Sequence, residues 1–220
     1  MFKNEKLEFK KIPIKDIIKK SKKFYEIISK RRSVRDFDSK KIDLKIIKNA
    51  ILSAGSAPNG ANLQPWHFVI IKDKKIKKKI RIAAENEEKE FYEKKAPKEW
   101  LKALEPLGTD ANKAFLETAP YLIGIFVKNY GTLPDGTRVK HYYATESVGI
   151  ATGILITALH NAGLATLTHT PSPMGFLNKI FKRPKNERPF LLLVAGYAEK
   201  EAQVPDIQKF SLNEISSYIG

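Results

Sequence analysis

Residues 142–161 read YYATESVGIATGILITALHN. Apolar side chains, among them Val148, Ile154 and Leu159, occur on nearly every side of a helix with this sequence. A helix that is apolar almost all round is typical of a protein interior. Gly163 follows where this helix would end, and glycine favours helix C-termini. We therefore expect a buried central helix around which the other elements pack.

Helices and strands alternate on both sides of this helix. Runs rich in β-branched and aromatic residues predict strands at 66–71, 120–127, 164–168 and 190–197. Apolar periodicity and end signals predict helices at 13–30, 43–55, 73–95 and 174–182, with a briefly helical or irregular stretch at 100–110. Without a repeat or a linker, this order predicts one α+β or α/β domain over 1–220. We expect the tail, about 205–220, to wrap over a partner subunit.

The chain carries a net charge of +16, with 40 Lys and Arg against 24 Asp and Glu, and 42% of its residues are hydrophobic. That hydrophobic content suffices for one sizeable core. Lysines concentrate at 72–81, KDKKIKKKIR. Clustered cations can form a nucleic-acid surface, but Ile76, Ile80 and Ala84 recur here at helical spacing. We favour the solvated face of an amphipathic helix and expect no nucleic-acid partner.

Cysteine is absent, which excludes disulfides, thiolate nucleophiles, iron–sulfur clusters and cysteine-bound zinc. No two of the four histidines have the i,i+4 spacing of a helical metal pair, so we expect no metal. The first residues mix charges of both signs, unlike a signal peptide. The longest apolar stretch, 147–159, is too short to span a bilayer. We expect a soluble, cytoplasmic protein without a membrane partner.

Common nucleotide-binding and hydrolase motifs are also missing. No G-x-G-x-x-G follows a predicted strand, and neither a P-loop nor a G-x-S-x-G elbow occurs. These absences leave an enzyme with another kind of cofactor, or a binding module.

Two motifs flank the helix predicted at 43–55. Residues 31–35 read RRSVR, and arginine forks together with the hydroxyl of Ser33 match the oxygens of a phosphate. On its own this motif is also typical of a basic surface turn. Residues 57–66 read APNGANLQPW, whose Pro-Asn-Gly requires a turn.

Taken together, RRSVRDF at 31–37 and APNGANLQPW at 57–66 resemble the FMN-dependent nitroreductase superfamily, in which an RRS-x-R-x-F start and a P-[SN]-x-x-N-x-Q-P-W loop flank the flavin. Other stretches resemble its iodotyrosine deiodinase branch, namely 88–100, 107–110, 113–120, 140–143, 158–164, 168–171 and 183–187. The resemblance spans about 30–205. It implies a nitroreductase-like α/β sandwich, with a mixed central sheet flanked by helices, in an intertwined homodimer.

The resemblance implies FMN as the cofactor, bound at the dimer interface. The residues implied to hold its phosphate and nearby ring atoms are Arg31, Arg32, Ser33, Val34 and Arg35. Lys209 occupies the region where the family places a further arginine near the phosphate. Asn59 and Gly60 would approach the flavin from the partner subunit.

Three consecutive residues, Thr168, His169 and Thr170, would run along the isoalloxazine edge. The hydroxyl of Thr170 would lie within hydrogen-bond reach of flavin N5 and favour stepwise one-electron transfer, which makes it the predicted catalytic residue. His169 stands where animal members commonly have threonine, and we assign it a backbone contact.

The predicted substrate residues supply an anion, a hydroxyl and a cation. Glu88 and Tyr92 lie i,i+4 on one predicted helix and project from the same face, and Lys113 follows in the next segment. Without the resemblance, Glu88 and Tyr92 would be explained as an ordinary pair of surface residues on a charged helix. With it, Glu88 would bind the ammonium of a halotyrosine, Tyr92 and Lys113 its carboxylate, and the backbone N–H of Ala61 its phenolate.

The resemblance therefore predicts an FMN-dependent oxidoreductase that removes halide from a halotyrosine or halophenol with electrons from reduced flavin. NAD(P)H or a reductase would supply those electrons. Two alternatives stay open. A general NAD(P)H-dependent nitroreductase or quinone reductase would share the phosphate motif without needing Glu88, Tyr92 and Lys113. A basic nucleic-acid-binding protein is the alternative from another class.

Overall fold

The structure, a computed structural model, describes residues 3–220 apart from the side chains of Lys94, Lys95, Lys98, Trp100 and Ala103. The chain divides into two compact units, residues 1–31 and 32–220. The first unit contains α1 (Ile14–Ile28), which begins after Pro13 and corresponds to the helix predicted at 13–30. A single domain over 1–220 stays a prediction.

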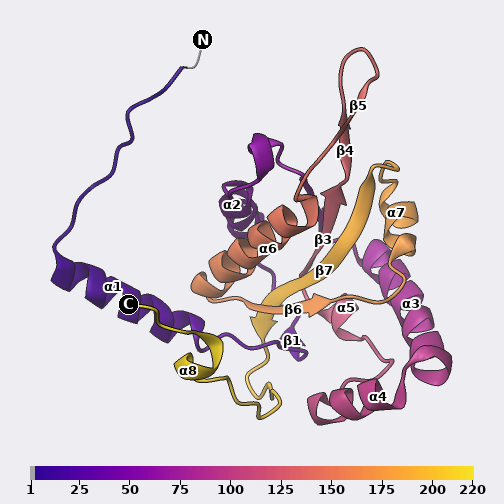
Figure 1. The fold of residues 1–220 in the computed structure, drawn as a ribbon. Coiled ribbons are helices and arrows are strands. Elements are labelled where there is room, and N and C mark those ends of the chain that lie inside the picture. The colour runs from indigo at the N-terminus through magenta and orange to yellow at the C-terminus, as the bar shows by residue number, and fades with distance from the viewer. Residues whose placement is uncertain (1–2) are drawn as a thin grey trace. The chain divides into compact units, whose positions relative to one another are not determined.

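The second unit is built on a five-stranded sheet (Figure 1). Its long strand β7 (Glu187–Ala198) pairs with β3 (Tyr121–Lys128), β6 (Ala165–His169) and β1 (Phe37–Asp38), and β3 also pairs with β2 (Trp66–Ile71). These ladders are antiparallel, and a parallel bridge joins Ser33 to Thr166. The predicted mixed sheet thus consists of antiparallel ladders, with parallel pairing at that bridge.

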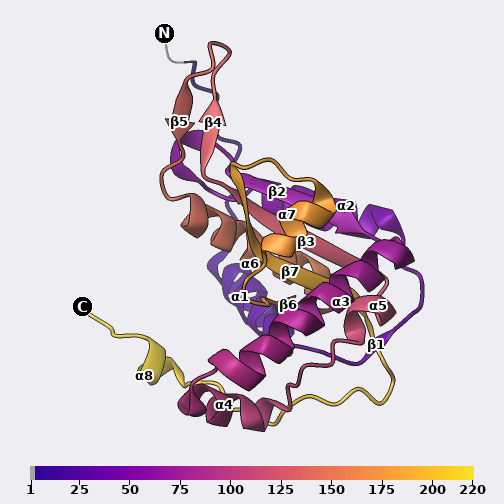
Figure 2. The same ribbon diagram turned by 90° about the vertical axis from the view of Figure 1, so that its right-hand side faces the viewer.

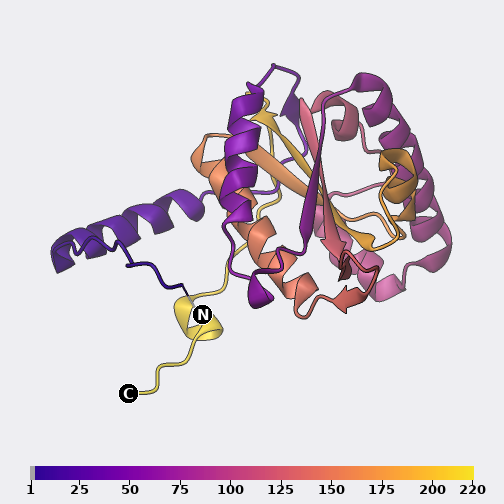
Figure 3. The ribbon, with the colours of Figure 1, turned by 90° about the horizontal axis from the view of Figure 1, so that it is seen from above.

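Helices cover both faces of the sheet (Figure 3). One layer consists of α2 (Leu44–Gly55) and α6 (Ala144–Asn161), and the other consists mainly of α3 (Lys74–Glu90) and α7 (Gly175–Phe181). Side chains of β3 alternate between the two layers, because successive residues of a strand point to opposite faces. Ile123 and Ile125 belong to the apolar core under α2 and α6, whereas Leu122 and Phe126 belong to the core under α3.

The predicted central helix, α6, is buried on one side. Val148, Ala151 and Leu155 are buried in the core that α6 shares with α2 and the sheet. The opposite side is open in the single chain, since Ile150 is 48% exposed and a Cβ added at Gly153 would meet nothing within 4 Å. The expectation of a buried central helix is therefore confirmed for one side of α6 only, because in one chain the sheet and α2 cover only that side.

Several short elements were not predicted from the sequence. They are α5 (Phe115–Thr118), β4 (Tyr130–Thr132), β5 (Arg138–Lys140), α8 (Leu212–Ile215) and the two-residue β1. The β4–β5 hairpin projects from the body of the second unit (Figure 2). Elements this short carry too few residues for a readable apolar period.

The segment after α3 adopts three different helical forms. The helix predicted at 73–95 ends as an α-helix at Glu90 and continues as a π-helical turn, η2 (Phe91–Lys95). The stretch predicted to be briefly helical contains α4 (Lys98–Leu104) and a 3-10 turn, η3 (Glu105–Leu107). Within the described residues, no helix combines the length and apolar character needed to cross a bilayer.

Candidate active site

The RRSVR motif lies beside β6 in the sheet. The backbone N–H of Val34 donates to the carbonyl of Thr166 at 3.2 Å, and the side chain of Val34 is buried. Because β6 runs on into Thr168 and His169, this pairing brings the predicted phosphate motif next to the predicted flavin-edge residues. Arg35, between the buried Val34 and the exposed Asp36, is half-buried.

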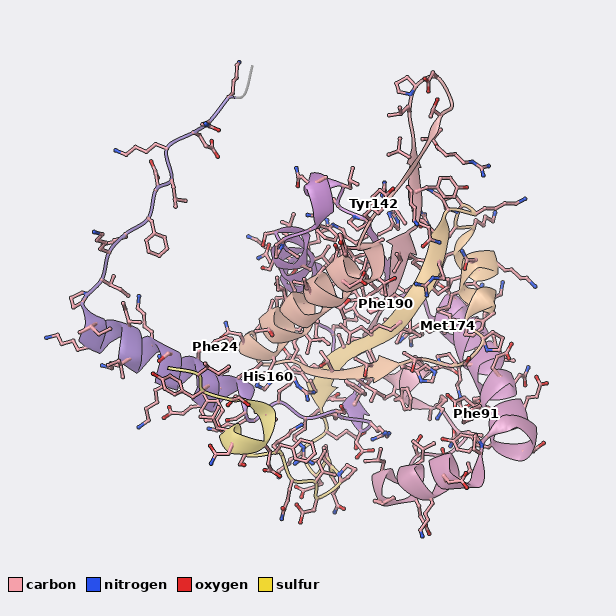
Figure 4. The ribbon with its side chains drawn as sticks, viewed as in Figure 1. Phe24, Phe91, Tyr142, His160, Met174 and Phe190 are labelled. Carbon is pink, nitrogen blue, oxygen red and sulfur yellow. The ribbon has the colours of Figure 1, made fainter. Side chains whose placement is uncertain are left out.

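A cavity of about 410 Å³ lies between α3, α4 and the end of β6. Its lining includes seven of the predicted site residues, namely Arg35, Glu88, Tyr92, Lys113, Thr168, His169 and Thr170. Apolar side chains complete it, among them Phe91, which lies at the end of α3 beside α4 (Figure 4), and Phe115. This volume lies in the range of small-molecule sites. The structure thus brings Glu88, Tyr92 and Lys113 to one cavity with the predicted flavin-edge residues.

A buried ion pair joins α3 to the segment before α5. Lys113 Nζ lies 3.4 Å from Glu88 Oε2, and the two side chains are only 5% and 15% exposed. The Nζ atom also donates to the backbone carbonyl of Asp110. Charges this deeply buried require a partner, so the pair holds an anion and a cation ready within the cavity.

Tyr92 lies in the π-turn after α3 rather than on the same regular helix as Glu88. Its hydroxyl is 3.4 Å from Thr109 Oγ1, and its ring centroid is 5.9 Å from Lys113 Nζ. The anion, the hydroxyl and the cation therefore share one wall of the cavity, although the helix geometry behind the i,i+4 prediction ends at Glu90. Turns of this type are frequent at functional sites.

His169 contributes a buried side chain to the cavity, which the sequence analysis did not predict. Its exposed fraction is 6%, and Nε2 has no hydrogen-bond partner in the structure. The ring packs edge-on against Phe115 with centroids 5.7 Å apart. Burial, together with the nearby charges of Lys113 and Arg35, lowers the pKa of His169 to about 3. The imidazole is therefore neutral at physiological pH.

The loop at 57–65 holds three non-glycine residues in the left-handed region. Ala61, Asn62 and Gln64 have φ values of 50°, 54° and 48°. The side chain of Asn59 bridges this loop, because its Oδ1 accepts from the backbone N–H of Gln64 at 2.8 Å and its Nδ2 donates to the carbonyl of Ala57 at 3.1 Å. Such conformations cost about 1–3 kcal/mol each and cluster at functional sites.

The loop and the cavity do not come together within one chain. Gly60 packs against the start of α6, where an added Cβ would lie 3.1 Å from the carbonyl oxygen of Tyr142, a residue labelled in Figure 4. Asn59, Gly60 and Ala61 are therefore absent from the cavity lining.

The other predicted phosphate residues, Arg31, Arg32, Ser33 and Lys209, are not among the residues that line the cavity. Arg31 belongs to the unit 1–31, so its role stays a prediction. Ser33 is exposed, as is Lys209 in the tail, and Arg32 donates through Nη2 to the carbonyl of Pro205 where that tail begins.

The solvated face predicted for the lysine-rich helix is correct for Lys74, Lys75, Lys78 and Lys79, which are exposed. It is wrong for Lys77, which is only 4% exposed and donates from Nζ to the carbonyls of Glu117 and Ala119. The sequence contains one signal of this contact, which is that residues 77, 81, 85 and 88 have the helical spacing of a single face. Within residues 3–220, no group of three or more His, Asp or Glu side chains could hold a metal ion.

Comparison with known proteins places the chain among flavin enzymes. The sequence model of the nitroreductase family matches residues 28–197. The iodotyrosine deiodinase of Haliscomenobacter hydrossis is 54% identical over 194 residues, which cover 88% of this chain and 87% of that protein. Human iodotyrosine deiodinase 1 is 44% identical over 204 residues, covering 92% of this chain and 71% of that protein.

A crystal structure of oxidized iodotyrosine deiodinase bound to FMN and 3-iodo-L-tyrosine has a similar fold. It superposes with a TM-score of 0.75 at 30% sequence identity, covering 89% of this chain and all of that one. A BluB-like flavoprotein from Clostridium difficile 630 superposes with a TM-score of 0.68 at 22% identity and shares the fold.

Proposed function

Because this chain belongs to the nitroreductase family and to its iodotyrosine deiodinase branch, we propose that it is an FMN-dependent oxidoreductase that removes halide from halotyrosines. The observation that carries the proposal is the single cavity that unites Glu88, Tyr92 and Lys113 with residues 168–170. The overall reaction replaces a carbon–halogen bond with a carbon–hydrogen bond and takes two electrons and one proton.

The residues along the cavity fit FMN. Arg35 offers a guanidinium, Thr168 and Thr170 offer hydroxyls, and Nε2 of His169 is a buried polar atom that a bound ligand can satisfy. When bound, FMN supplies the electrons that reduce the substrate. The FMN phosphate and nearby ring atoms would be held by Arg31, Arg32, Ser33, Val34 and Arg35, and Lys209 would lie near the phosphate.

The ion pair at the cavity suits an amino-acid zwitterion. An incoming halotyrosine places its ammonium at Glu88 and its carboxylate at Lys113 and Tyr92, so each buried charge exchanges one partner for another. No charge is left unpaired during the exchange, which keeps the cost of desolvation low. A simple halophenol offers neither group and leaves the existing pair in place.

The phenol end of the substrate would be bound by the loop at 57–65. The backbone N–H of Ala61 would donate to the phenolate, and the left-handed conformation at Ala61 sets the direction of that N–H. Thr170 would act at flavin N5, and it lines the cavity just beyond the end of β6.

A homodimer would bring that loop to the cavity of a second subunit. In the single chain, α6 exposes Ile150 and open space at Gly149 and Gly153, and the tail exposes Phe210 and Ile215. Exposed apolar surface of this kind is typical of an interface. We propose that the second copy covers this face of α6, that Asn59 and Gly60 approach the flavin across the interface, and that residues 205–220 wrap over the partner. NAD(P)H or a reductase of the cytoplasm would supply electrons.

The function can be tested under anaerobic conditions. Purified holoenzyme is reduced, 3-iodo-L-tyrosine is added, and flavin reoxidation is followed together with release of tyrosine and iodide. We expect one tyrosine for each reduced flavin. If the flavin stays reduced in the presence of iodotyrosine but is reoxidised by a nitroaromatic compound, the chain is instead a general nitroreductase.

A further inference from the structure

One face of α3 carries four charged side chains that contact the segment 109–119. Lys77, Arg81, Glu85 and Glu88 follow one another at intervals of four, four and three residues, so they share a face of the helix. Lys77 donates to the backbone at the end of this segment, and Glu88 pairs with Lys113 near its beginning. Arg81 and Glu85 lie between these two contacts.

Glu85 fixes the backbone of Lys113. Its Oε1 accepts the backbone N–H of Lys113 at 2.8 Å and also accepts from Arg81 Nε at 2.7 Å. Burial by itself would raise the pKa of Glu85, but the hydrogen bonds from Arg81 and from the N–H of Lys113 outweigh it and hold that pKa below its usual value. Glu85 is therefore an ionised acceptor at neutral pH.

Arg81 extends the contact in both directions along the segment. Its Nη2 donates to Asn112 Oδ1 at 3.1 Å and its Nη1 donates to Glu117 Oε1 at 3.3 Å. The planar guanidinium thus connects Glu85 on α3 with residues on either side of Lys113, a geometry that the ammonium of a lysine cannot reproduce.

The segment has little support of its own. The α-helix within it, α5, has four residues and no side-chain cap at its start. Helices this short are unstable without tertiary contacts. Neither Arg81 nor Glu85 is among the residues that line the cavity, so neither touches a ligand bound there.

We propose that Arg81 and Glu85 are positioning residues that hold Lys113 opposite Glu88 and thereby make the site prefer substrates with an amino-acid zwitterion over simple halophenols. Glu88 and Lys113 together form a zwitterion clamp, and α3 positions both of its charges. Glu88 lies on that helix, and Lys113 is bound to the helix through Glu85. The inference rests on the proposed function and adds to it two residues outside the cavity.

The test compares L-3-iodotyrosine with 2-iodophenol on the holoenzyme. Replacing Glu85 in Glu85→Ala removes the acceptor of the Lys113 N–H, and we expect KM for iodotyrosine to rise ~10-fold. The kcat for iodotyrosine and the KM for 2-iodophenol should each stay within about twofold. Glu85→Gln keeps an acceptor oxygen and should recover most of the loss, and Arg81→Lys should resemble Glu85→Ala in a milder form.

Glu87→Ala provides the matched control, because it removes a neighbouring carboxylate of α3 for which the structure gives no contact to the segment 109–119. Its KM values should equal those of the wild type. Equal rises in KM for both substrates in Glu85→Ala, or no rise for either, would overturn the inference, since a general loss of structure does not distinguish a zwitterion from a phenol.

Hydrogen exchange separates this inference from the proposed function. The backbone amide of Lys113 should exchange ~10-fold faster in Glu85→Ala holoenzyme than in the wild type. If wild-type enzyme fails to dehalogenate iodotyrosine, the proposed function is wrong, while faster exchange confined to 109–114 still supports positioning. Unchanged exchange contradicts it.

Discussion

The α3 side of the site and the α6 side are completed in different ways. On the α3 side, the charged residues that face the segment 109–119 find their partners within the same chain, as in the pairs Arg81–Glu85 and Lys113–Glu88. On the α6 side, an apolar helix face is uncovered, and three non-glycine residues of the adjacent loop keep a left-handed backbone. The Lys113–Glu88 pair is thus complete within one chain, whereas the exposed face of α6 fits the proposed coverage by a second copy.

The largest expected effect comes from breaking the α3 side at Glu88. Glu88→Gln removes the anion proposed to bind the substrate ammonium, and it takes away the carboxylate that pairs with the buried Lys113. We expect kcat/KM for iodotyrosine to fall ~100-fold, as for a lost charge-assisted hydrogen bond of ~2.7 kcal/mol. Reduction of a nitroaromatic substrate by the same variant should be spared. If both activities fall alike, the clamp does not recognise a zwitterion.

A second prediction compares one exposed isoleucine from each layer. Ile150 on α6 and Ile82 on α3 are 48% and 50% exposed in the single chain. Ile150→Asp places a charge in the proposed interface. We expect this variant to sediment as a monomer and to bind FMN at least ~10-fold more weakly, because the free-energy cost of desolvating one charge exceeds about 1.4 kcal/mol. Ile82→Asp, the matched control, should sediment as the wild type does and keep the wild-type affinity for FMN. An equal response of the two variants would show that the layers do not differ.

The smallest effect concerns the buried imidazole of His169. Its pKa is about 3 in the folded protein against 6.5 for a free side chain, so the unfolded chain takes up the proton first as pH falls. The stability that the neutral ring contributes is complete above pH 6.5 and declines toward pH 3. Between pH 7.5 and 5.5, the unfolding free energy of wild-type holoenzyme should fall by ~1.4 kcal/mol more than that of His169→Gln. Denaturant titrations with saturating FMN measure the difference, and parallel changes would contradict a neutral buried ring.

Most of the longer elements could be predicted from the sequence because their signals are local. Asp43 predicts the start of α2, and its side chain indeed accepts the N–H of Lys45 at 2.7 Å. The strands β2 and β3 were predicted from apolar runs that the sheet buries. For Lys77, the helical spacing shared with residues 81, 85 and 88 is a local signal of a common face. That spacing does not indicate what the face contacts, because the acceptors of Lys77 are backbone carbonyls 40 and 42 residues away.

The alternation of helices and strands, the family, and the residue types of the clamp could all be predicted from the sequence, because periodicity, end signals and motifs are local features of the chain. Three features are visible only in the folded chain: Glu88, Lys113 and residues 168–170 share a cavity, Glu85 accepts the backbone N–H of Lys113, and α6 is open on one side. These features depend on which surfaces pack together. The sequence of an apolar helix such as α6 fits a second face that packs against the chain's own sheet as well as one that packs against a partner, so it does not distinguish the two.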